Sequence, residues 1–259
     1  MGQRIGYEVK GKVAYLTMSR PEKRNALDDE AIREMTEFLA EAESDRKVRV
    51  IAIRGEGSSF SAGADLEYLL RLSRNTPPSN FQESSALKDL LLNIYKSKKL
   101  TCAIVRGPAL AGAFGIVLAC DLVMASDTAR FGFTEVKIGF VPAIVLNFAL
   151  RKLRESDVRR LVLTGDIIDC AEAVKIGITS DAIPDRDLDR ITETFFGDFV
   201  SGTSSKAVAL TKEILSRVRE LNLNEALRFS TKMNVVARAT DDFQKGVNSF
   251  LKKEKPRWE

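Results

Sequence analysis

The chain contains 259 residues, of which 44% are apolar and 29% charged, enough to bury one large core. It contains no histidine, which excludes Ser-His-Asp and Cys-His catalysis, an imidazole general base and every metal site that needs a histidine ligand. The net charge of +4 comes from 40 basic and 36 acidic residues mixed along the chain, and this is not the basic stripe of a nucleic-acid-binding protein.

The cysteines and the N-terminal residues favour a reducing compartment. Cys102, Cys120 and Cys170 stand far apart without a CxxC pair, so neither a disulfide framework nor a thiolate zinc site is expected. The opening MGQRIGYEVKGK is charged and lacks the apolar core of a signal peptide, and the longest uncharged stretch, 107–120, is too short to span a bilayer. We therefore expect a cytoplasmic protein with no metal and no membrane segment.

The first two thirds of the chain alternate between strand and helix patterns. Short β-branched runs at 13–18, 48–53, 101–105 and 122–125 predict buried strands. Between them, apolar residues at helical spacing predict a helix after the N-cap Asp28 and a second helix over 83–95. A strand, a small-residue turn and a helix follow one another at 50–66 and again at 103–119. This order predicts an α/β protein made of stacked strand-helix units.

The segment 75–80 (NTPPSN) and the chain after Asp185 depart from this alternation. NTPPSN carries two prolines and no apolar anchor, which predicts a mobile surface loop beside a site. After Asp185 only helical patterns occur, over 188–200, 204–218, 224–239 and 241–251. Their apolar residues, such as Met233 and Phe243, exceed what a solvated appendix needs. We expect a core over 1–195 and a helical oligomerisation region over 196–259.

Two turns rich in small residues are candidates for binding a negative charge. In FSAGADL (60–66), Gly63 precedes a helix start and leaves the N–H of Ala64 unpaired. In GPALAGAFG (107–115), Gly112 opens an apolar helix in the same way. Together the two N–H donors predict an oxyanion hole, although glycine and alanine at strand-helix junctions more often serve close packing.

Glu135 is the candidate proton-transfer residue. It lies in RFGFTEV (130–136) beside Phe131, Phe133 and Val136, in a segment that the pattern predicts to be a buried strand. Two interpretations stay open. Glu135 is either a general acid/base with a pKa raised by partial desolvation, or a strand-end glutamate that faces solvent or pairs with Lys137.

Four motifs in order, SRPEKRNALD, FSAGADL, ALAGAFGIVLACD and FGFTEVKIGFVP, resemble those of the enoyl-CoA hydratase/isomerase (crotonase) superfamily. The resemblance runs from about residue 5 to the C-terminal VNSFLKKEKPRW. It implies a spiral of ββα units followed by C-terminal helices that form trimers, usually paired as hexamers. It also implies an acyl-CoA thioester substrate, with no cofactor beyond the coenzyme A of that substrate.

The resemblance also assigns roles to individual positions. The backbone N–H groups of Ala64 and Gly112 would hold the thioester oxygen, and Glu135 matches the second of the two catalytic glutamates of the hydratases. Two segments are expected to bind coenzyme A. The first contacts its adenine and pantetheine parts, and the second lies near its phosphates. The first segment contains Ala62, Asp65 and Leu66, and the second contains Lys23 and Arg24.

One position departs from the two-glutamate pattern, because Gly115 stands where the first glutamate is expected. Bacterial enzymes similar to methylglutaconyl-CoA hydratase also have glycine there, and this branch resembles the chain most. We therefore expect a lyase that adds water to a short or branched 2-enoyl-CoA with a single glutamate. The alternatives are an isomerase or decarboxylase on the same scaffold, or a non-catalytic CoA- or RNA-binding member.

Several neighbouring residues have simpler interpretations. Asp65 is expected to stabilise a helix start, and Asp121 to make structural hydrogen bonds. Glu67 is a candidate replacement for the absent glutamate, although a solvated position is favoured. Tyr68 and Phe140 are candidates for lining an acyl pocket, although aromatic residues at such positions more often serve packing.

Overall fold

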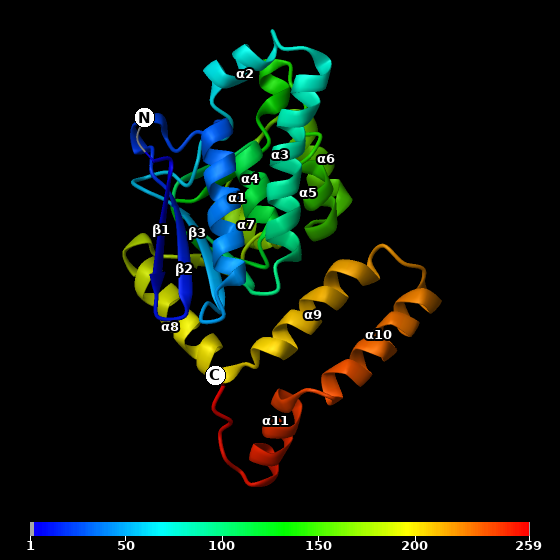
Figure 1. The fold of residues 1–259 in the computed structure, drawn as a ribbon. Helices are drawn as coiled ribbons and strands as arrows, with labels where there is room; N and C mark the ends of the chain where they lie inside the picture. Colours follow the sequence, from blue (N-terminus) through cyan, green and yellow to red (C-terminus); the bar gives the residue numbers. More distant parts are fainter. Residues whose placement is uncertain (1–2, 259) are drawn as a thin grey trace.

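The computed structural model describes residues 3–258, which form two β-sheets covered by helices (Figure 1). The larger sheet has the strand order β1-β2-β3-β4-β6-β9. Only β1 and β2 pair antiparallel, and the other neighbours are parallel. These strands span Ile5–Lys10, Val13–Met18, Val50–Gly55, Leu100–Val105, Leu122–Ser126 and Ala182–Ile183.

The smaller sheet brings distant segments together. Its strands β5, β7 and β8 span Pro108–Leu110, Arg130–Gly132 and Ile167–Asp169, with β7 in the middle. Because β5 and β7 are parallel, with Leu110 opposite Gly132, the chain leaves both strands at the same edge. The turn that follows residue 110 and the segment around Glu135 are therefore neighbours.

The helices cover both faces of the larger sheet, which explains its continuous apolar strands. Within β3, Ile51 and Ile53 pack into the main core, whereas Val50 and Ala52 pack on the opposite face with Phe196. The helices α1 to α8 span Asp29–Ser44, Leu66–Leu72, Pro77–Lys96, Gly112–Ala119, Leu146–Lys152, Glu155–Thr164, Cys170–Ile176 and Leu188–Gly202. Short 3-10 turns occur at Pro21–Lys23 (η1), Glu135–Ile138 (η2) and Asp185–Asp187 (η3).

Local sequence signals place most of these elements correctly. The predicted strand at 13–18 coincides with β2, and the Asp28 carboxylate accepts a hydrogen bond from the N–H of Ala31 at 2.9 Å, as an N-cap does. The apolar helix predicted to begin at Gly112 is α4, in which every residue from Ala113 to Ala119 is buried. Apolar residues all round a helix are typical of a helix enclosed by the core.

Two predictions of local structure were wrong. The segment 75–80 is not a loop throughout, because α3 begins at Pro77. Proline is tolerated in a first helical turn, where its missing N–H would have no intrahelical partner. Glu135 is not in a strand either. Strand β7 ends at Gly132, which pairs with the last residue of β5 and the first residue of the antiparallel β8, and Glu135 begins the turn η2.

The last three helices extend away from the sheets (Figure 1). They are α9 (Ser205–Val218), α10 (Leu223–Arg238) and α11 (Asp241–Leu251). Their exposed apolar side chains include Leu227, Val235 and Phe250. Helix α8 packs on the larger sheet and continues through residue 195, so the predicted boundary falls inside a helix, and the use of 196–259 in oligomerisation stays a prediction. Across residues 3–258, none of the helices has both the length and the apolar character to cross a membrane.

Candidate active site

The two small-residue turns lie side by side. The N–H of Ser61 donates to the carbonyl of Pro108 at 2.9 Å, and the N–H of Leu110 donates back to Ser61 at 3.1 Å. On the other side of the loop, Leu27 donates to the carbonyl of Gly63 at 2.8 Å. These bonds fix the chain before Ala64 against the strand that leads into α4.

Gly63 is required by the close approach of these turns. Its φ is +93°, and a Cβ there would stand 2.8 Å from the carbonyl oxygen of Leu110 and 2.9 Å from the Cβ of Ala111. Ala111 itself has φ 50°, a conformation that costs an alanine free energy, at the N-cap of α4. The turn before Ala64 is therefore packed against the residue before Gly112, and that residue, Ala111, is held in a strained conformation.

Ala64, Gly112 and Glu135 line one cavity of about 430 Å³. Within residues 3–258, no hydrogen-bond acceptor is found for the N–H of Ala64 or of Gly112. Gly112 is the first residue of α4, where backbone N–H groups lack intrahelical partners, and Ala64 is the bridge residue just before Asp65, the N-cap of α2. The structure thus brings together the three residues for which the sequence predicted chemistry.

The Glu135 carboxyl is desolvated, and one of its oxygens has no partner among the described residues. Glu135 is 6% exposed, and its buried Oε2 has no hydrogen-bond partner among the described residues. Burial raises the pKa of Glu135 above its usual value, and none of the described cations forms an ion pair with it. The alternative of an ion pair with Lys137 is wrong, because within η2 the Glu135 side chain is buried whereas the Lys137 side chain is exposed. A carboxyl with a raised pKa is more readily protonated than an exposed one, which suits a group that takes up and releases a proton.

The space that a side chain at position 115 would need is filled by neighbouring side chains. A Cβ on Gly115 would stand 2.3 Å from Cγ1 and 2.9 Å from Cβ of Val145, and 3.4 Å from Cδ1 of Leu91. Val145, just before α5, therefore takes the space that a longer side chain on α4 would need. Sequence reasoning found the glycine but missed Val145, which gives no local signal.

Among the residues expected to contact coenzyme A, Ala62 and Leu66 line the cavity and Asp65 does not. Asp65 is the N-cap of α2, where its Oδ1 accepts from the N–H of Glu67 at 3.0 Å and of Tyr68 at 3.3 Å. Burial by itself raises the pKa of Asp65, but those N–H groups and the charges of Lys23 and Arg20 bring it below its usual value. The expected helix-start role is thus confirmed.

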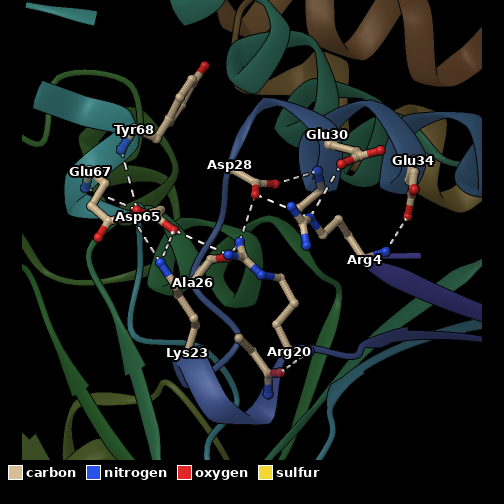
Figure 2. Close-up of polar contacts among 12 residues, drawn as sticks. Arg4, Arg20, Lys23, Ala26, Asp28, Glu30, Glu34, Asp65, Glu67 and Tyr68 are labelled. Carbon is tan, nitrogen blue, oxygen red and sulfur yellow. Dashed lines mark hydrogen bonds and ion pairs between the residues drawn. The ribbon is translucent and has the colours of Figure 1, made fainter. Parts of the chain in front are cut away.

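An ion-pair network ties Asp65 to the N-terminal elements (Figure 2). Buried Arg20 lies 2.7 Å from Oδ2 of Asp28 and 3.4 Å from Oδ2 of Asp65. Arg4 reaches Asp28 at 3.2 Å. The network joins the starts of α1 and α2 and so holds the segment before Ala64. The SRPEKRNALD motif contains Arg20, but sequence reasoning assigned it no role.

Lys23 and Arg24 are exposed and stand beside, not in, the cavity. The Lys23 ammonium lies 3.0 Å from Oε2 of Glu67, and this hydrogen bond, with the nearby Asp65 charge, raises the pKa of Lys23. The carbonyl of Arg24 accepts from the N–H of Ala62 at 2.9 Å. Lys23 is therefore tied to the start of α2 after Ala64, and the backbone of Arg24 is tied to the loop before it.

Helices α2 and α3 form the other wall of the cavity. Tyr68 lines it, and its hydroxyl donates to Oε2 of Glu83 at 2.5 Å. Leu87, one turn further along α3, is the nearest side chain to Gly112, with its Cδ2 4.0 Å from a Cβ built there. Phe140 lies on the rim and is 51% exposed. The pocket-lining interpretation of Tyr68 and Phe140 is confirmed, and Glu83 is a further lining residue that the sequence did not single out.

Other candidates lie away from the cavity. Asp121 accepts from the N–H and the hydroxyl of Thr101, at 2.8 and 2.9 Å, and forms an ion pair with Lys212 of α9, which confirms its structural role. Burial raises the pKa of the Cys120 thiol to about 12, so that thiol is unreactive at neutral pH.

The two turns and Glu135 line one cavity, and this arrangement suits a ligand whose oxygen gains negative charge beside a carboxyl that can transfer a proton. Residues 8–259 match the sequence model of the enoyl-CoA hydratase/isomerase family. The chain therefore belongs to that family and is an enzyme of it, with the crotonase fold. Membership indicates acyl-CoA thioesters as the substrate class.

Relatives of known name agree with this assignment. A Thermus thermophilus protein whose name describes an enoyl-CoA hydratase is 36% identical over 250 residues, covering 96% of this chain and 98% of its own. The (E)-benzylidenesuccinyl-CoA hydratase of Thauera aromatica is 30% identical over 97% of both chains. The crystal structure of an enoyl-CoA hydratase from Shewanella pealeana is 27% identical, with a TM-score of 0.92 over 98% of this chain and 96% of that one.

Proposed function

We propose that the protein is a hydro-lyase that adds water across the C2–C3 double bond of a short 2-enoyl-CoA. The N–H groups of Ala64 and Gly112 hold the thioester oxygen, and Glu135 alone transfers the proton. One observation carries the proposal: the unpartnered, buried Oε2 of Glu135 shares a cavity with two backbone N–H groups that have no acceptor in residues 3–258.

The two N–H groups act on the charge that develops during the reaction. When the oxygen of water attacks C3, the electron pair of the double bond moves toward the carbonyl, and the thioester oxygen becomes an enolate oxygen. Donors fixed in advance stabilise that oxygen without reorganisation, and loss of one typically lowers the rate about a hundredfold to a thousandfold. The hydrogen bonds around Gly63 and the start of α4 supply the fixation.

Glu135 transfers one proton of the added water, and the other proton stays on the oxygen that becomes the hydroxyl group at C3. As a carboxylate it takes one proton from the attacking water, so that hydroxide is delivered to C3. The resulting carboxylic acid then gives that proton to C2 of the enolate, which returns the thioester to its carbonyl form. A pKa raised by burial brings the two protonation states closer in free energy at the working pH, as a group that alternates between base and acid requires.

A double-bond isomerase is the second candidate, and the packing at Gly115 favours it. Val145 and Leu91 fill the place where a second carboxylate would stand. A single glutamate suffices to carry one proton between C2 and C4, whereas a hydratase must also position water. The oxyanion hole serves both reactions, so the geometry of the donors does not separate them.

The remaining expectations are parts of the same proposal. Lys23 and Arg24 attract the phosphates of coenzyme A, Ala62 and Leu66 border the path of its pantetheine arm, and Asp65 acts there through the helix start that it caps. The exposed apolar side chains of α9 to α11 support a homotrimer or a dimer of trimers. We propose a cytoplasmic enzyme that uses no cofactor beyond the coenzyme A of its substrate.

The acyl group is the least constrained part of the proposal. The names of relatives differ in the acyl group, as that of the Thauera aromatica enzyme shows, so identity near 30% does not transfer a substrate. A cavity of about 430 Å³ with mostly apolar walls supports a short chain.

A panel of thioesters tests the function. Purified protein is incubated with crotonyl-CoA, 3-methylglutaconyl-CoA and a 3-enoyl-CoA, and the absorbance of the conjugated thioester is followed. A hydratase consumes the conjugated alkene of a 2-enoyl-CoA and forms a 3-hydroxyacyl-CoA. An isomerase instead creates absorbance from the 3-enoyl-CoA. Turnover of the 3-enoyl-CoA without any hydration of the 2-enoyl-CoA panel would replace the first candidate by the second.

A further inference from the structure

The cavity contains a second carboxylate, Glu83, that the proposed reaction does not use. Glu83 lies on α3 and is half-buried, and its Oε2 accepts the hydroxyl proton of Tyr68 at 2.5 Å. Tyr68 is 7% exposed, and both residues line the cavity that holds Ala64, Gly112 and Glu135. Figure 2 shows the Tyr68 ring leading away from Asp65, so the hydroxyl stands apart from the ion-pair network.

The register of α3 places Glu83 within reach of an acyl chain whose thioester oxygen is held at Gly112. Leu87 follows Glu83 by four residues, which puts the two on one face of the helix about 6 Å apart along its axis. Leu87 is also the nearest side chain to Gly112, whose N–H is the proposed donor to the thioester oxygen. Glu83 therefore stands about one helical turn from the thioester end of the cavity.

The chemistry of the pair is that of a hydrogen-bond acceptor with negative charge. The Tyr68 hydroxyl donates its only proton to a hydrogen bond with Glu83. Toward the cavity its oxygen can therefore only accept hydrogen bonds, as the carboxylate does. Burial and the adjacent Glu83 raise the pKa of Tyr68, so the phenol keeps its proton. Lys23 and Arg24, the cations of the candidate site, lie outside the cavity lining, and so does Arg71, whose guanidinium carbon lies 5.7 Å from the centre of the Tyr68 ring.

We propose that the Tyr68–Glu83 pair selects against acyl groups that end in a carboxylate and restricts the enzyme to uncharged acyl chains. The proposal rests on the acyl-CoA function above and specifies its substrate class. A terminal carboxylate would meet a like charge in a cavity with apolar walls and no described cation in its lining. It follows that a branched diacid thioester such as 3-methylglutaconyl-CoA is a poor substrate.

Binding of two saturated thioesters of similar shape tests the proposal without turnover. Glutaryl-CoA ends in a carboxylate, and 5-methylhexanoyl-CoA carries two methyl groups in place of its two oxygens. We expect the wild-type protein to bind 5-methylhexanoyl-CoA at least about tenfold more tightly by calorimetry. In Glu83→Gln, which keeps an acceptor for the Tyr68 hydroxyl, the preference should shrink to within about threefold.

Two further variants control the charge and the anchoring. Asp89→Asn removes the same charge from an exposed position on α3 that does not line the cavity, and should keep the wild-type preference. Tyr68→Phe keeps the Glu83 charge but releases its hydrogen bond, and should give an intermediate preference. An equal or reversed preference in the wild type, an unchanged preference in Glu83→Gln, or failure of 5-methylhexanoyl-CoA to bind would overturn the proposal.

The outcome is separable from that of the proposed function. If crotonyl-CoA is hydrated but glutaryl-CoA binds as well as its neutral counterpart, the function stands and the charge selection is wrong. If crotonyl-CoA is not hydrated but the preference and its loss in Glu83→Gln are observed, the selection stands on a different reaction.

Discussion

The two walls of the cavity are built in different ways. The inner wall consists of the turns at Gly63 and Ala111 and the buried Glu135, held by backbone hydrogen bonds and close packing. The outer wall consists of α2 and the start of α3, where Leu66, Leu70 and Phe81 are 64%, 61% and 76% exposed. The backbone of the inner wall can serve one chemistry, whereas side chains of the outer wall can change without disturbing it. We infer that reaction and selectivity are carried by separate parts of one cavity.

The largest expected effect concerns the one proton-transferring side chain of the inner wall. Glu135→Gln keeps the size of the side chain but removes its base, so turnover should fall about a hundredfold to ten-thousandfold while acyl-CoA still binds. Steady-state kinetics and a binding isotherm measure the two quantities. Asp89→Asn, on the outer face of α3, should leave both unchanged, and full turnover in Glu135→Gln would show that another group moves the proton.

The next effect concerns the backbone of the inner wall. Gly63→Ala places a Cβ 2.8 Å from the carbonyl oxygen of Leu110 and shifts the Ala64 donor, so turnover should drop about a hundredfold to a thousandfold. The matched control is Gly177→Ala, because Gly177 also has a positive φ, +84°, but has no atom within 4 Å of a built Cβ. Both variants should lose stability in thermal unfolding, and only Gly63→Ala should lose turnover. Equal turnover in the two variants would show that the conformation of the turn at Gly63 does not matter for catalysis.

A smaller effect is expected from the packing at Gly115. Gly115→Glu forces a side chain into Val145, and such overpacking costs about 1 to 3 kcal/mol of unfolding free energy. Val145→Ala alone leaves a cavity, but in the double variant the two changes should partly compensate. Urea unfolding of the four proteins gives the coupling free energy. Strictly additive losses would mean that Val145 does not occupy the space of the missing side chain.

The smallest expected effect is a dependence of stability on pH. Because burial raises the pKa of Glu135 in the folded protein, the folded state holds a proton that the unfolded state has already released. The contribution of Glu135 to stability is therefore complete below the ordinary glutamate pKa and is lost as pH rises through the raised value. Thermal unfolding across that range should show a decline in the wild type that Glu135→Gln lacks, and parallel curves would contradict the raised pKa.

The pH dependence of turnover has the opposite sign. Glu135 must be ionised to accept a proton from water, so kcat/KM should fall as pH is lowered through the raised pKa. This acid limb belongs to the inner wall and should persist in Glu83→Gln. If the acid limb disappears in Glu83→Gln, the group that titrates is Glu83 and not Glu135.

Much of the fold was predictable because it is written in local patterns. The period of apolar residues places β2, α1 and the four helices after Asp185 within a few residues, and Asp28 marks a helix start. Errors arose where local propensity competed with position. Pro77 was taken as a helix breaker although proline fits a first turn, and Glu135 was assigned to a strand whose pairing ends three residues earlier.

The candidate site divides in the same way. Glu135, Gly112 and the segment of Ala64 were predictable because each stands in a motif of recognisable residue types. Val145 and Glu83 were not, because an isolated valine or glutamate on a helix has no meaning until its neighbour in space is known. Val145 meets Gly115 from thirty residues along the chain, and Glu83 meets Tyr68 from the adjoining helix.

By itself the sequence determined that the protein has no imidazole to use, that its strands and helices alternate, and that two glycine turns and one glutamate are its chemical resources. Only the tertiary structure decided that these resources share one cavity, that Val145 closes the place of a second carboxylate, and that Glu83 stands in the opposite wall. The physical reason is that periodicity and capping act over a few residues. Desolvation and charge at a site depend on contacts between segments that the chain separates.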